Sequence, residues 1–300
     1  MPASKQVHQS NVRDLLSWAH AYLRERGLPE PLADAEVLLA RALGIERWRL
    51  SWSGEIAVEL AQETLFRDWV GRRGRFEPLH YILELREFWS LDFQVTSDVL
   101  IPRPETEILV EETLRCARFF EREGNLRILD VGAGSGNIAV VLAKELPGAQ
   151  VVAVDCSAKA LGVAARNCRT HGVSQRVSLL CSDLALALRS DARFSLVVAN
   201  LPYIDRAGLD FLPSDVRNYE PRIALDGGEG GTQILDRLIE AAPSLLENGG
   251  FFLLEIGAGQ SEWLKTRIKT TLGLMDARFV SDLSGVERVF VVCKEEPPRG

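Results

Sequence analysis

The chain has few of the residues that build disulfide frameworks and metal sites. Its five cysteines are odd in number, widely spaced and without a CxxC pair, which argues against a disulfide framework or a zinc site and is typical of reduced thiols. The four histidines form no HExxH or similar cluster, so we expect no metal. No apolar stretch approaches the ~20 residues of a membrane span, and residues 1–10 lack the apolar region of a secretory signal. We therefore expect a cytoplasmic protein that binds no membrane.

A surplus of basic charge is also missing. The formal net charge is −7 over 300 residues, which argues against a protein that coats nucleic acid without sequence preference. One stretch, residues 67–75, holds four arginines around a single aspartate. It is interpreted as a solvated helix end favoured by the helix dipole, with a docking patch for an RNA-containing or acidic partner as the alternative.

The first part of the chain follows the periodicity of helices. Apolar residues recur at i, i+3, i+4, i+7 and i+11 between Val12 and Leu23, and further helices are expected over residues 31–43 and around residues 58–70. We therefore predict a small all-α domain over residues 1–78. Four of the six tryptophans are expected to lie in its core: Trp18, Trp48, Trp52 and Trp69.

Residues 79–104 are predicted to form a β-hairpin and a proline-rich linker. Segments 81–83, 88–89 and 91–95 alternate better as strands than as helices. The linker ends at Ile101-Pro102-Arg103-Pro104, where two prolines restrict the backbone, and a helix is expected from Glu105.

Residues 105–294 alternate strand and helix patterns. Strands are expected at residues 127–131, 150–155, 177–181, 194–199, 251–255, 277–280 and 287–292. This alternation predicts an α/β domain with a mainly parallel, Rossmann-like sheet of seven strands and helices on both faces, and the short turn before the last strand predicts a C-terminal antiparallel hairpin. Residues 204–231 are expected to form a long loop, and residues 295–300 a disordered tail.

A glycine-rich loop follows the first strand of this sheet and opens a helix. The loop reads Asp130-Val131-Gly132-Ala133-Gly134-Ser135-Gly136, and glycines there permit a tight turn and a close approach of a ligand to the backbone. Asp155, at the end of the second strand, can accept hydrogen bonds from both hydroxyls of a ribose. Loop and acid together predict a nucleoside-containing cofactor.

The spacing of the loop favours one cofactor over another. Dinucleotide sites usually have GxGxxG, because pyrophosphate binds at the helix N-terminus, whereas this loop has GxGxG followed by Asn137. S-adenosyl-L-methionine carries a ribose and an adenine but no phosphate. Asp183 is placed to meet the adenine amino group and Leu184 to cover the ring, although a helix N-cap explains Asp183 equally well.

A polar and aromatic tetrapeptide follows the fourth strand. Asn200-Leu201-Pro202-Tyr203 stands where strands of open α/β sheets present ligand-binding residues. The Asn200 side chain and the Leu201 carbonyl can accept hydrogen bonds from a planar NH₂ group, Pro202 keeps Leu201 extended, and Tyr203 can stack on the substrate. For the tetrapeptide alone, a strand-end turn with a packed tyrosine is the simpler interpretation.

Taken together, these motifs resemble the release-factor glutamine methyltransferase family (HemK/PrmC type). The resemblance covers nearly the whole chain and includes Arg-Glu-Phe-Trp-Ser at 86–90, Leu-Ile-Pro-Arg-Pro-Glu-Thr-Glu at 100–107 and Tyr-Glu-Pro at 219–221. It implies a class I fold and transfer of a methyl group from S-adenosyl-L-methionine to N5 of the glutamine in the GGQ motif of peptide chain release factors, which act in translation termination. It further implies that the helical domain docks the release factor; we expect a monomer.

Two positions depart from the family pattern. Leu201 replaces the first proline of the usual Asn-Pro-Pro-Tyr, and Leu184 stands where family members often carry tryptophan. Only a backbone carbonyl is needed from Leu201, so we expect activity to survive, whereas the family pattern gives less support to the adenine contact of Leu184.

Two other substrates are weighed as alternatives. Similar tetrapeptides serve exocyclic amino groups of adenine or cytosine in nucleic acid, but the acidic charge and the lack of a basic, aromatic-rich recognition domain argue against stable nucleic acid binding. A sister family methylates a glutamine of a ribosomal protein, and the proline-rich linker resembles the release-factor branch better. An NAD-dependent oxidoreductase is disfavoured by the glycine spacing and the final hairpin.

Overall fold

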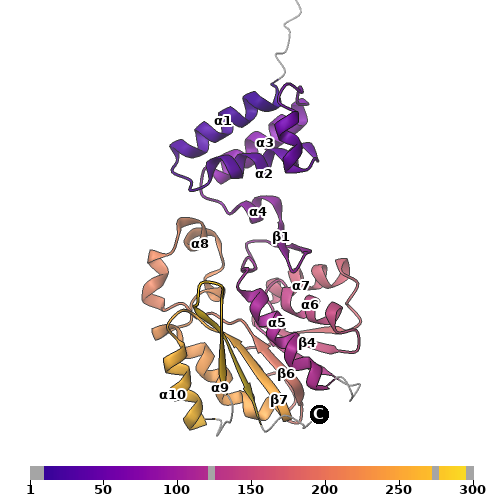
Figure 1. Ribbon diagram of the computed structural model, residues 1–300, viewed down its shortest axis with the longest axis vertical. Coiled ribbons are helices and arrows are strands. Elements are labelled where there is room, and N and C mark those ends of the chain that lie inside the picture. The colour runs from indigo at the N-terminus through magenta and orange to yellow at the C-terminus, as the bar shows by residue number, and fades with distance from the viewer. Residues whose placement is uncertain (1–9, 121–125, 272–276, 295–300) are drawn as a thin grey trace, which may run out of the picture. The chain divides into compact units, whose positions relative to one another are not determined.

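The computed structural model describes residues 10–120, 126–271 and 277–294 (Figure 1). It contains two compact units. The helical unit comprises the described residues up to Glu84 together with Ser214–Tyr219, and the sheet unit comprises Leu85–Pro213 and the described residues from Glu220 onward. The predicted tail at residues 295–300 lies outside the described residues.

Three helices build the core of the helical unit. They are α1 (Val12–Glu25), α2 (Pro31–Leu43) and α3 (Leu60–Arg73). The three helices predicted from the periodicity of apolar residues are thus confirmed. The side chain of Asn11 accepts a hydrogen bond from the N–H of Asp14 and so caps α1. Apolar side chains from all three helices, such as Leu15, Leu38 and Phe66, are completely buried between them. A short helix, α8 (Ser214–Tyr219), belongs to the same unit.

Two predictions for the helical unit are wrong. Trp48 and Trp52 lie on a 3-10 helix, Arg47–Trp52, and are 63% and 85% exposed, because this short element lacks a second face to bury. The arginine-rich helix end is only partly solvated. Arg73 is buried and forms an ion pair of 2.7 Å with Asp34, which is also buried, so one arginine of the group joins α3 to α2.

The strand prediction for residues 81–83 is wrong as well. These residues belong to α4 (Leu79–Leu83), because Pro78 begins a turn in which its carbonyl accepts hydrogen bonds from the N–H groups of Tyr81 and Ile82. Glu84 ends the helix in the left-handed conformation. The predicted hairpin follows directly, with β1 (Leu85–Phe88) antiparallel to β2 (Leu91–Gln94).

A seven-stranded sheet forms the centre of the sheet unit, as predicted. Its order is β5-β4-β3-β6-β7-β9-β8, with β3 to β7 parallel and β9 antiparallel to both β7 and β8. The bounds are β3 (Arg127–Val131), β4 (Gln150–Asp155), β5 (Val177–Cys181), β6 (Phe194–Ala199), β7 (Leu246–Glu255), β8 (Arg278–Ser281) and β9 (Glu287–Cys293). β7 starts five residues earlier than expected, because Asn248-Gly249-Gly250 lies within the strand, next to an irregular register against β6.

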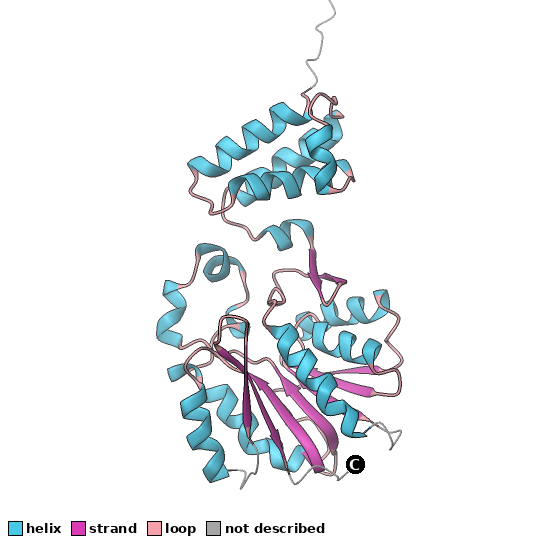
Figure 2. Cartoon of the chain, viewed as in Figure 1, coloured by secondary structure: helices cyan, strands magenta, loops and turns pink. Residues whose placement is uncertain are grey.

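Helices cover both faces of this sheet (Figure 2). One face packs against α5 (Thr106–Ala117), α6 (Asn137–Glu145) and α7 (Ala158–Thr170). The other face packs against α9 (Gln233–Leu245) and α10 (Ser261–Thr271). The two resulting cores are buried apolar layers, one on each side of the strands. Because the helices cover the faces of the sheet and not its ends, the carboxyl ends of the parallel strands are free to bind a ligand.

The segment 204–231 is not one long loop. It contains short 3-10 helices at Arg206–Phe211, Arg222–Ala224 and Glu229–Gly231 in addition to α8. Backbone hydrogen bonds between Ile204 and residues Leu225 and Gly227 close its two ends together. In the part of the chain that the structure describes, we find no helix with the length and apolar character needed to cross a membrane.

Candidate active site

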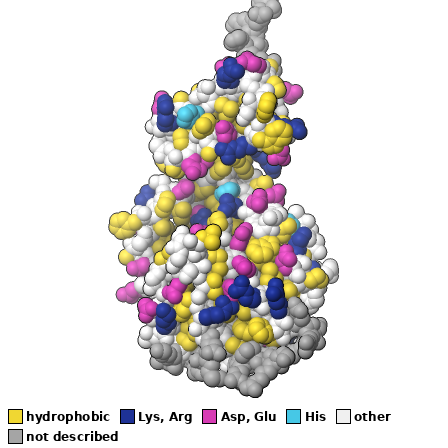
Figure 3. Space-filling model, viewed as in Figure 1, with side chains coloured by type: hydrophobic (Ala, Val, Ile, Leu, Met, Phe, Trp, Pro, Cys, Tyr) yellow, Lys and Arg dark blue, Asp and Glu magenta, His cyan; other side chains and the backbone are white. Residues whose placement is uncertain are grey.

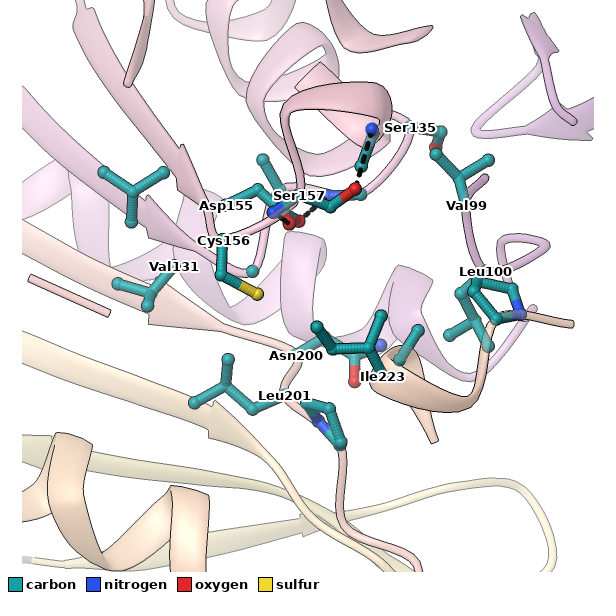
Figure 4. Close-up of a pocket in the computed structure, with 18 of the residues that line it drawn as sticks. Val99, Leu100, Val131, Ser135, Asp155, Cys156, Ser157, Asn200, Leu201 and Ile223 are labelled. Carbon is teal, nitrogen blue, oxygen red and sulfur yellow. Dashed lines mark hydrogen bonds between the residues drawn. The ribbon is translucent and has the colours of Figure 1, made fainter. Parts of the chain in front are cut away.

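A pocket opens at the carboxyl ends of β3, β4 and β6 (Figure 4). It is lined by the glycine loop, the ends of these strands, the segment before α5 and parts of residues 221–237. Ten of the twelve residues that the sequence assigns to cofactor binding or catalysis line it: Gly132, Ala133, Gly134, Ser135, Asp155, Asp183, Leu184, Asn200, Leu201 and Pro202. The structure therefore brings together the two motifs that the sequence presents about 65 residues apart.

The glycine loop needs its glycines for close approach. Gly132 has φ of +84°, and a Cβ atom there would lie 2.9 Å from the side chain of Leu201 and 3.1 Å from the Asn200 carbonyl oxygen. Gly136 is absent from the pocket lining and serves packing instead, since a Cβ there would lie 3.0 Å from that of Ala164 on α7. Both positions favour glycine by their positive φ and by the lack of space.

Asp155 is held rigidly at the end of β4. Its Oδ2 accepts a hydrogen bond of 2.8 Å from the N–H of Gly134, and its Oδ1 accepts one of 2.8 Å from the N–H of Ser157. Each carboxylate oxygen can accept more than one hydrogen bond. The acid therefore stands between the glycine loop and the start of α7 with capacity left for two hydroxyls.

The segment that follows β5 contributes a polar residue and an apolar one to the pocket. Asp183 forms an ion pair of 2.6 Å with Arg237 of α9, and both side chains are about half exposed. Leu184, next to it, has φ of +49° and packs against the apolar core of this sheet face. Arg237 also lines the pocket, a residue that no sequence motif indicated.

The tetrapeptide after β6 divides into residues that line the pocket and one that does not. Asn200, Leu201 and Pro202 line it, and Leu201 is buried against the adjacent apolar core. Tyr203 is absent from the lining and packs on the same core; its carbonyl accepts a hydrogen bond from Gln260. Burial, together with the charge of Glu255, raises the pKa of the Tyr203 hydroxyl to about 12, so the ring stays neutral.

The amide of Asn200 has two buried polar neighbours. Its Nδ2 donates a hydrogen bond of 3.0 Å to Oγ1 of Thr106, the first residue of α5. The Glu255 carboxyl at the end of β7 is the second neighbour, and its interaction with the Thr106 hydroxyl and the Asn200 amide lowers its pKa against the larger effect of burial. Burial raises the pKa of Glu255 to about 7. These neighbours were not found by sequence reasoning, because neither lies in a motif that by itself points to Asn200.

The segment before α5 forms a further wall of the pocket that sequence reasoning missed. Val99 and Leu100 lie across the pocket from Val131 and Cys156 (Figure 4). This wall is fixed by Glu220, which accepts hydrogen bonds from the Arg103 guanidinium and from the N–H of Ile101. The remaining lining residues that no motif indicated include Ser182, Ile223 and Ile234.

Comparison with known proteins matches both parts of the chain. Residues 14–83 match the family model of the PrmC N-terminal domain, and residues 128–215 match that of a methyltransferase domain. The release factor glutamine methyltransferase of Geobacter sulfurreducens is 42% identical, over 93% of this chain and 95% of that protein. The one from Moorella thermoacetica is 40% identical, over 95% of this chain and 99% of that protein.

Solved structures share the fold at low identity. The hMettl16 catalytic domain, solved in complex with MAT2A 3'UTR hairpin 1, has a TM-score of 0.57 at 13% identity and covers 93% of this chain, with 92% of its own length matched. A METTL16 methyltransferase domain has a TM-score of 0.53 at 17% identity, over 97% of this chain and 98% of its own. These likenesses confirm the predicted Rossmann-like methyltransferase fold.

Proposed function

The chain belongs to the family of release factor glutamine methyltransferases, and from this premise we propose that it methylates N5 of the glutamine in the GGQ motif of peptide chain release factors, with S-adenosyl-L-methionine as the methyl donor. The observation that carries the proposal is the placement of Asn200 and Leu201 in the same pocket as the glycine loop and Asp155. A nucleoside site and a site for a planar amide thus lie side by side.

The pocket residues fit the nucleoside end of this donor. Asp155 keeps free acceptor capacity on both oxygens for the ribose hydroxyls. Gly132, Ala133, Gly134 and Ser135 bring the backbone to the pocket surface without a large side chain. We assign the adenine to Asp183 and Leu184, which also line the pocket. The Asp183 carboxylate must exchange part of its ion pair with Arg237 for the adenine amino group, or share it with both.

Asn200 and Leu201 hold the glutamine amide. An amide nitrogen is a poor nucleophile because its lone pair is delocalised into the carbonyl. The Oδ1 of Asn200 and the carbonyl of Leu201 accept the two hydrogens of the substrate NH₂, which orients the nitrogen and stabilises the positive charge that develops on it. When bound beside the glycine loop and Asp155, S-adenosyl-L-methionine would supply a methyl group activated by its sulfonium sulfur, with S-adenosylhomocysteine as the leaving group and one amide proton released.

Pro202 and Tyr203 support this clamp. Pro202 restricts Leu201 to an extended conformation and so directs its carbonyl. For Tyr203 we propose contact with the substrate glutamine once the release factor is bound, since it directly follows the lining residue Pro202.

We assign docking of the release factor to residues 1–78, with residues 79–104 as linker and 105–294 as the transferring domain. Exposed apolar side chains on the helical unit support this assignment: Trp48, Trp52, Ile56, Leu60 and Leu65 are all more than 40% exposed. Exposed aromatic side chains are enriched at protein interfaces. We further propose that the protein acts as a cytoplasmic monomer without stable binding to nucleic acid; the net charge of −7 supports the last point.

Labelled S-adenosyl-L-methionine tests the substrate directly. The protein is incubated with release factor, with a release factor whose GGQ glutamine is replaced, with ribosomal proteins and with rRNA. We expect label only in the unaltered release factor. Label that enters the variant equally well, the ribosomal proteins or rRNA would contradict the proposed substrate.

A further inference from the structure

Two buried residues outside the sequence motifs for cofactor and substrate contact the amide of Asn200. Thr106 is 1% exposed and Glu255 is 2% exposed. Their positions follow from the fold. Ala199 pairs with Leu254 across β6 and β7, so the next residues, Asn200 after β6 and Glu255 at the end of β7, lie side by side. Helix α5 begins at Thr106, which contacts Asn200.

The hydrogen bonds in this group have one consistent direction. An ionised carboxylate only accepts hydrogen bonds, so Glu255 attracts the proton of the neighbouring Thr106 hydroxyl, and this interaction lowers the pKa of the acid. The oxygen of that hydroxyl is then free to accept the 3.0 Å bond from Nδ2 of Asn200. The Asn200 amide also lowers the pKa of Glu255, an effect that its NH₂ end has on a carboxylate and its oxygen end does not. Both neighbours of the amide therefore attract its NH₂ end.

The direction matters because an asparagine amide has two ends of similar shape and opposite character. The oxygen end accepts hydrogen bonds and suits the NH₂ of a glutamine substrate, whereas the NH₂ end would repel it. With the NH₂ end held by Thr106 and Glu255, Oδ1 is the end left for the pocket that Asn200 lines.

We propose that Glu255 and Thr106 are positioning residues, which fix the amide orientation of Asn200 so that its oxygen faces the substrate glutamine. This inference rests on the proposed function, since it assigns a role in the same amide clamp. Neither residue touches the reacting atoms. Each acts through the Asn200 amide.

A purely structural role explains Glu255 poorly. Its Oε2 has no hydrogen-bond partner among the described residues, and a buried acid with an unsatisfied oxygen lowers the stability of the folded state. Burial raises its pKa from the usual range to about 7, which also reflects an unfavourable environment for the charge. The acid is therefore retained at a cost in stability, which is expected for a group that acts in the site.

Glu255→Gln is the decisive variant, because it keeps size and shape but can present either an acceptor or a donor to Asn200. We expect kcat for release-factor methylation to fall about 10-fold or more, since loss of one preorganised group at developing charge costs up to about 10²–10³ in kcat. The affinity for S-adenosyl-L-methionine, measured by calorimetry, should stay within about 2-fold. The thermal midpoint should not fall.

Thr106→Val and Thr106→Ser form a second pair. The valine variant removes the hydroxyl at similar volume and should lower kcat, and the serine variant restores the hydroxyl and should recover most of it. Glu112→Gln is the matched control, because Glu112 is also a 2% exposed glutamate but forms ion pairs with Arg115 and Arg278 away from the pocket. Its substitution should lower the thermal midpoint and leave kcat unchanged.

The outcomes separate this inference from the function on which it rests. If the unaltered protein methylates release factor but Glu255→Gln and Thr106→Val keep kcat within about 2-fold, the positioning role is wrong and the proposed function stands. If kcat falls only in proportion to a lowered thermal midpoint, or Thr106→Ser fails to recover it, the role is structural and the inference is again wrong. If the unaltered protein methylates no release factor, both are overturned.

Discussion

Arg103 and Glu220, 117 residues apart in sequence, form an ion pair of 2.5 Å at the edge of the pocket. The Glu220 side chain is 1% exposed and that of Arg103 is 33% exposed. Through Oε2, Glu220 also accepts a hydrogen bond of 3.3 Å from the N–H of Ile101. One buried acid from the Tyr-Glu-Pro motif thus fixes the proline-rich segment that forms a pocket wall.

We expect Glu220→Ala to weaken both the fold and cofactor binding. Removal of one partner of a buried ion pair typically costs about 3–5 kcal/mol, and partial exposure of Arg103 reduces this to about 1–3 kcal/mol in the free energy of unfolding. The dissociation constant for S-adenosyl-L-methionine should rise, because residues 98–100, 102 and 103 line the pocket. Urea unfolding and calorimetry measure the two effects.

Arg189→Ala is the matched control for this variant. Arg189 and Asp191 form an ion pair with side chains 85% and 69% exposed, and exposed pairs contribute little. The urea midpoint of Arg189→Ala should equal that of the unaltered protein. An equal fall in both variants would mean that the Arg103–Glu220 pair has no special role.

Asp155→Ala should affect cofactor binding before it affects transfer. Hydrogen bonds to a charged group contribute about 1.5–3 kcal/mol each, so loss of the carboxylate should raise the dissociation constant for S-adenosyl-L-methionine by about 10–100-fold. The variant should regain much of its methylation rate at saturating cofactor. An unchanged dissociation constant, measured by calorimetry, would remove Asp155 from the cofactor site.

Asp130 lies in β3, just before the first glycine of the loop. Its burial predicts that the stability of the protein depends on pH. Asp130 is completely buried, neither carboxylate oxygen has a hydrogen-bond partner among the described residues, and burial raises its pKa to about 7. The folded protein therefore binds this proton more tightly than the unfolded chain does, so the contribution of Asp130 is full below pH about 4 and is lost as the pH rises through about 7.

Asp130→Asn should consequently stabilise the protein at alkaline pH. At pH 8 we expect its free energy of unfolding to exceed that of the unaltered protein by on the order of 2 kcal/mol, so its thermal midpoint should be clearly higher. At pH 5 the difference in thermal midpoint should be much smaller. Thermal melts at the two pH values measure the difference. A gain of equal size at pH 5 would show that proton binding by Asp130 is not its cause.

Glu255 predicts a pH dependence of the reaction itself. Burial raises its pKa to about 7, and the charged or titratable groups that act on it are Glu105, Arg288 and Tyr203. Protonation turns the carboxyl group into a donor that competes for the Thr106 oxygen, so kcat should fall as the pH falls through about 7. In the Glu255→Gln variant, kcat should not fall as the pH is lowered from 8 to 6. An unchanged profile would assign the titration to another group.

The parts of the fold that depend on local pattern were predicted from the sequence. The seven strands, the order of helices and the hairpin follow from periodicity. That the glycine loop, Asp155 and Asn200 lie close together follows because strand ends in such sheets meet at one edge, whereas their roles remain predictions.

The features that were missed depend on contacts between distant segments. Nothing near Glu220 or Glu255 in the sequence tells which residue each will meet, since their partners Arg103 and Thr106 lie more than 100 residues away. The sequence predicts a strand at residues 81–83, which form part of a helix, because three apolar residues fit either period. Exposure of Trp48 and Trp52 was missed because aromatic residues are usually buried.

Mass spectrometry of the modified release factor tests the central claim most directly. After reaction with the unaltered protein, fragmentation of the GGQ peptide should locate one added methyl group on the side-chain amide nitrogen of the glutamine. Asn200→Ala, which should bind S-adenosyl-L-methionine with nearly unchanged affinity, should leave the peptide unmodified. A methyl group at any other atom, or a fully methylated glutamine produced by Asn200→Ala, would contradict the amide clamp.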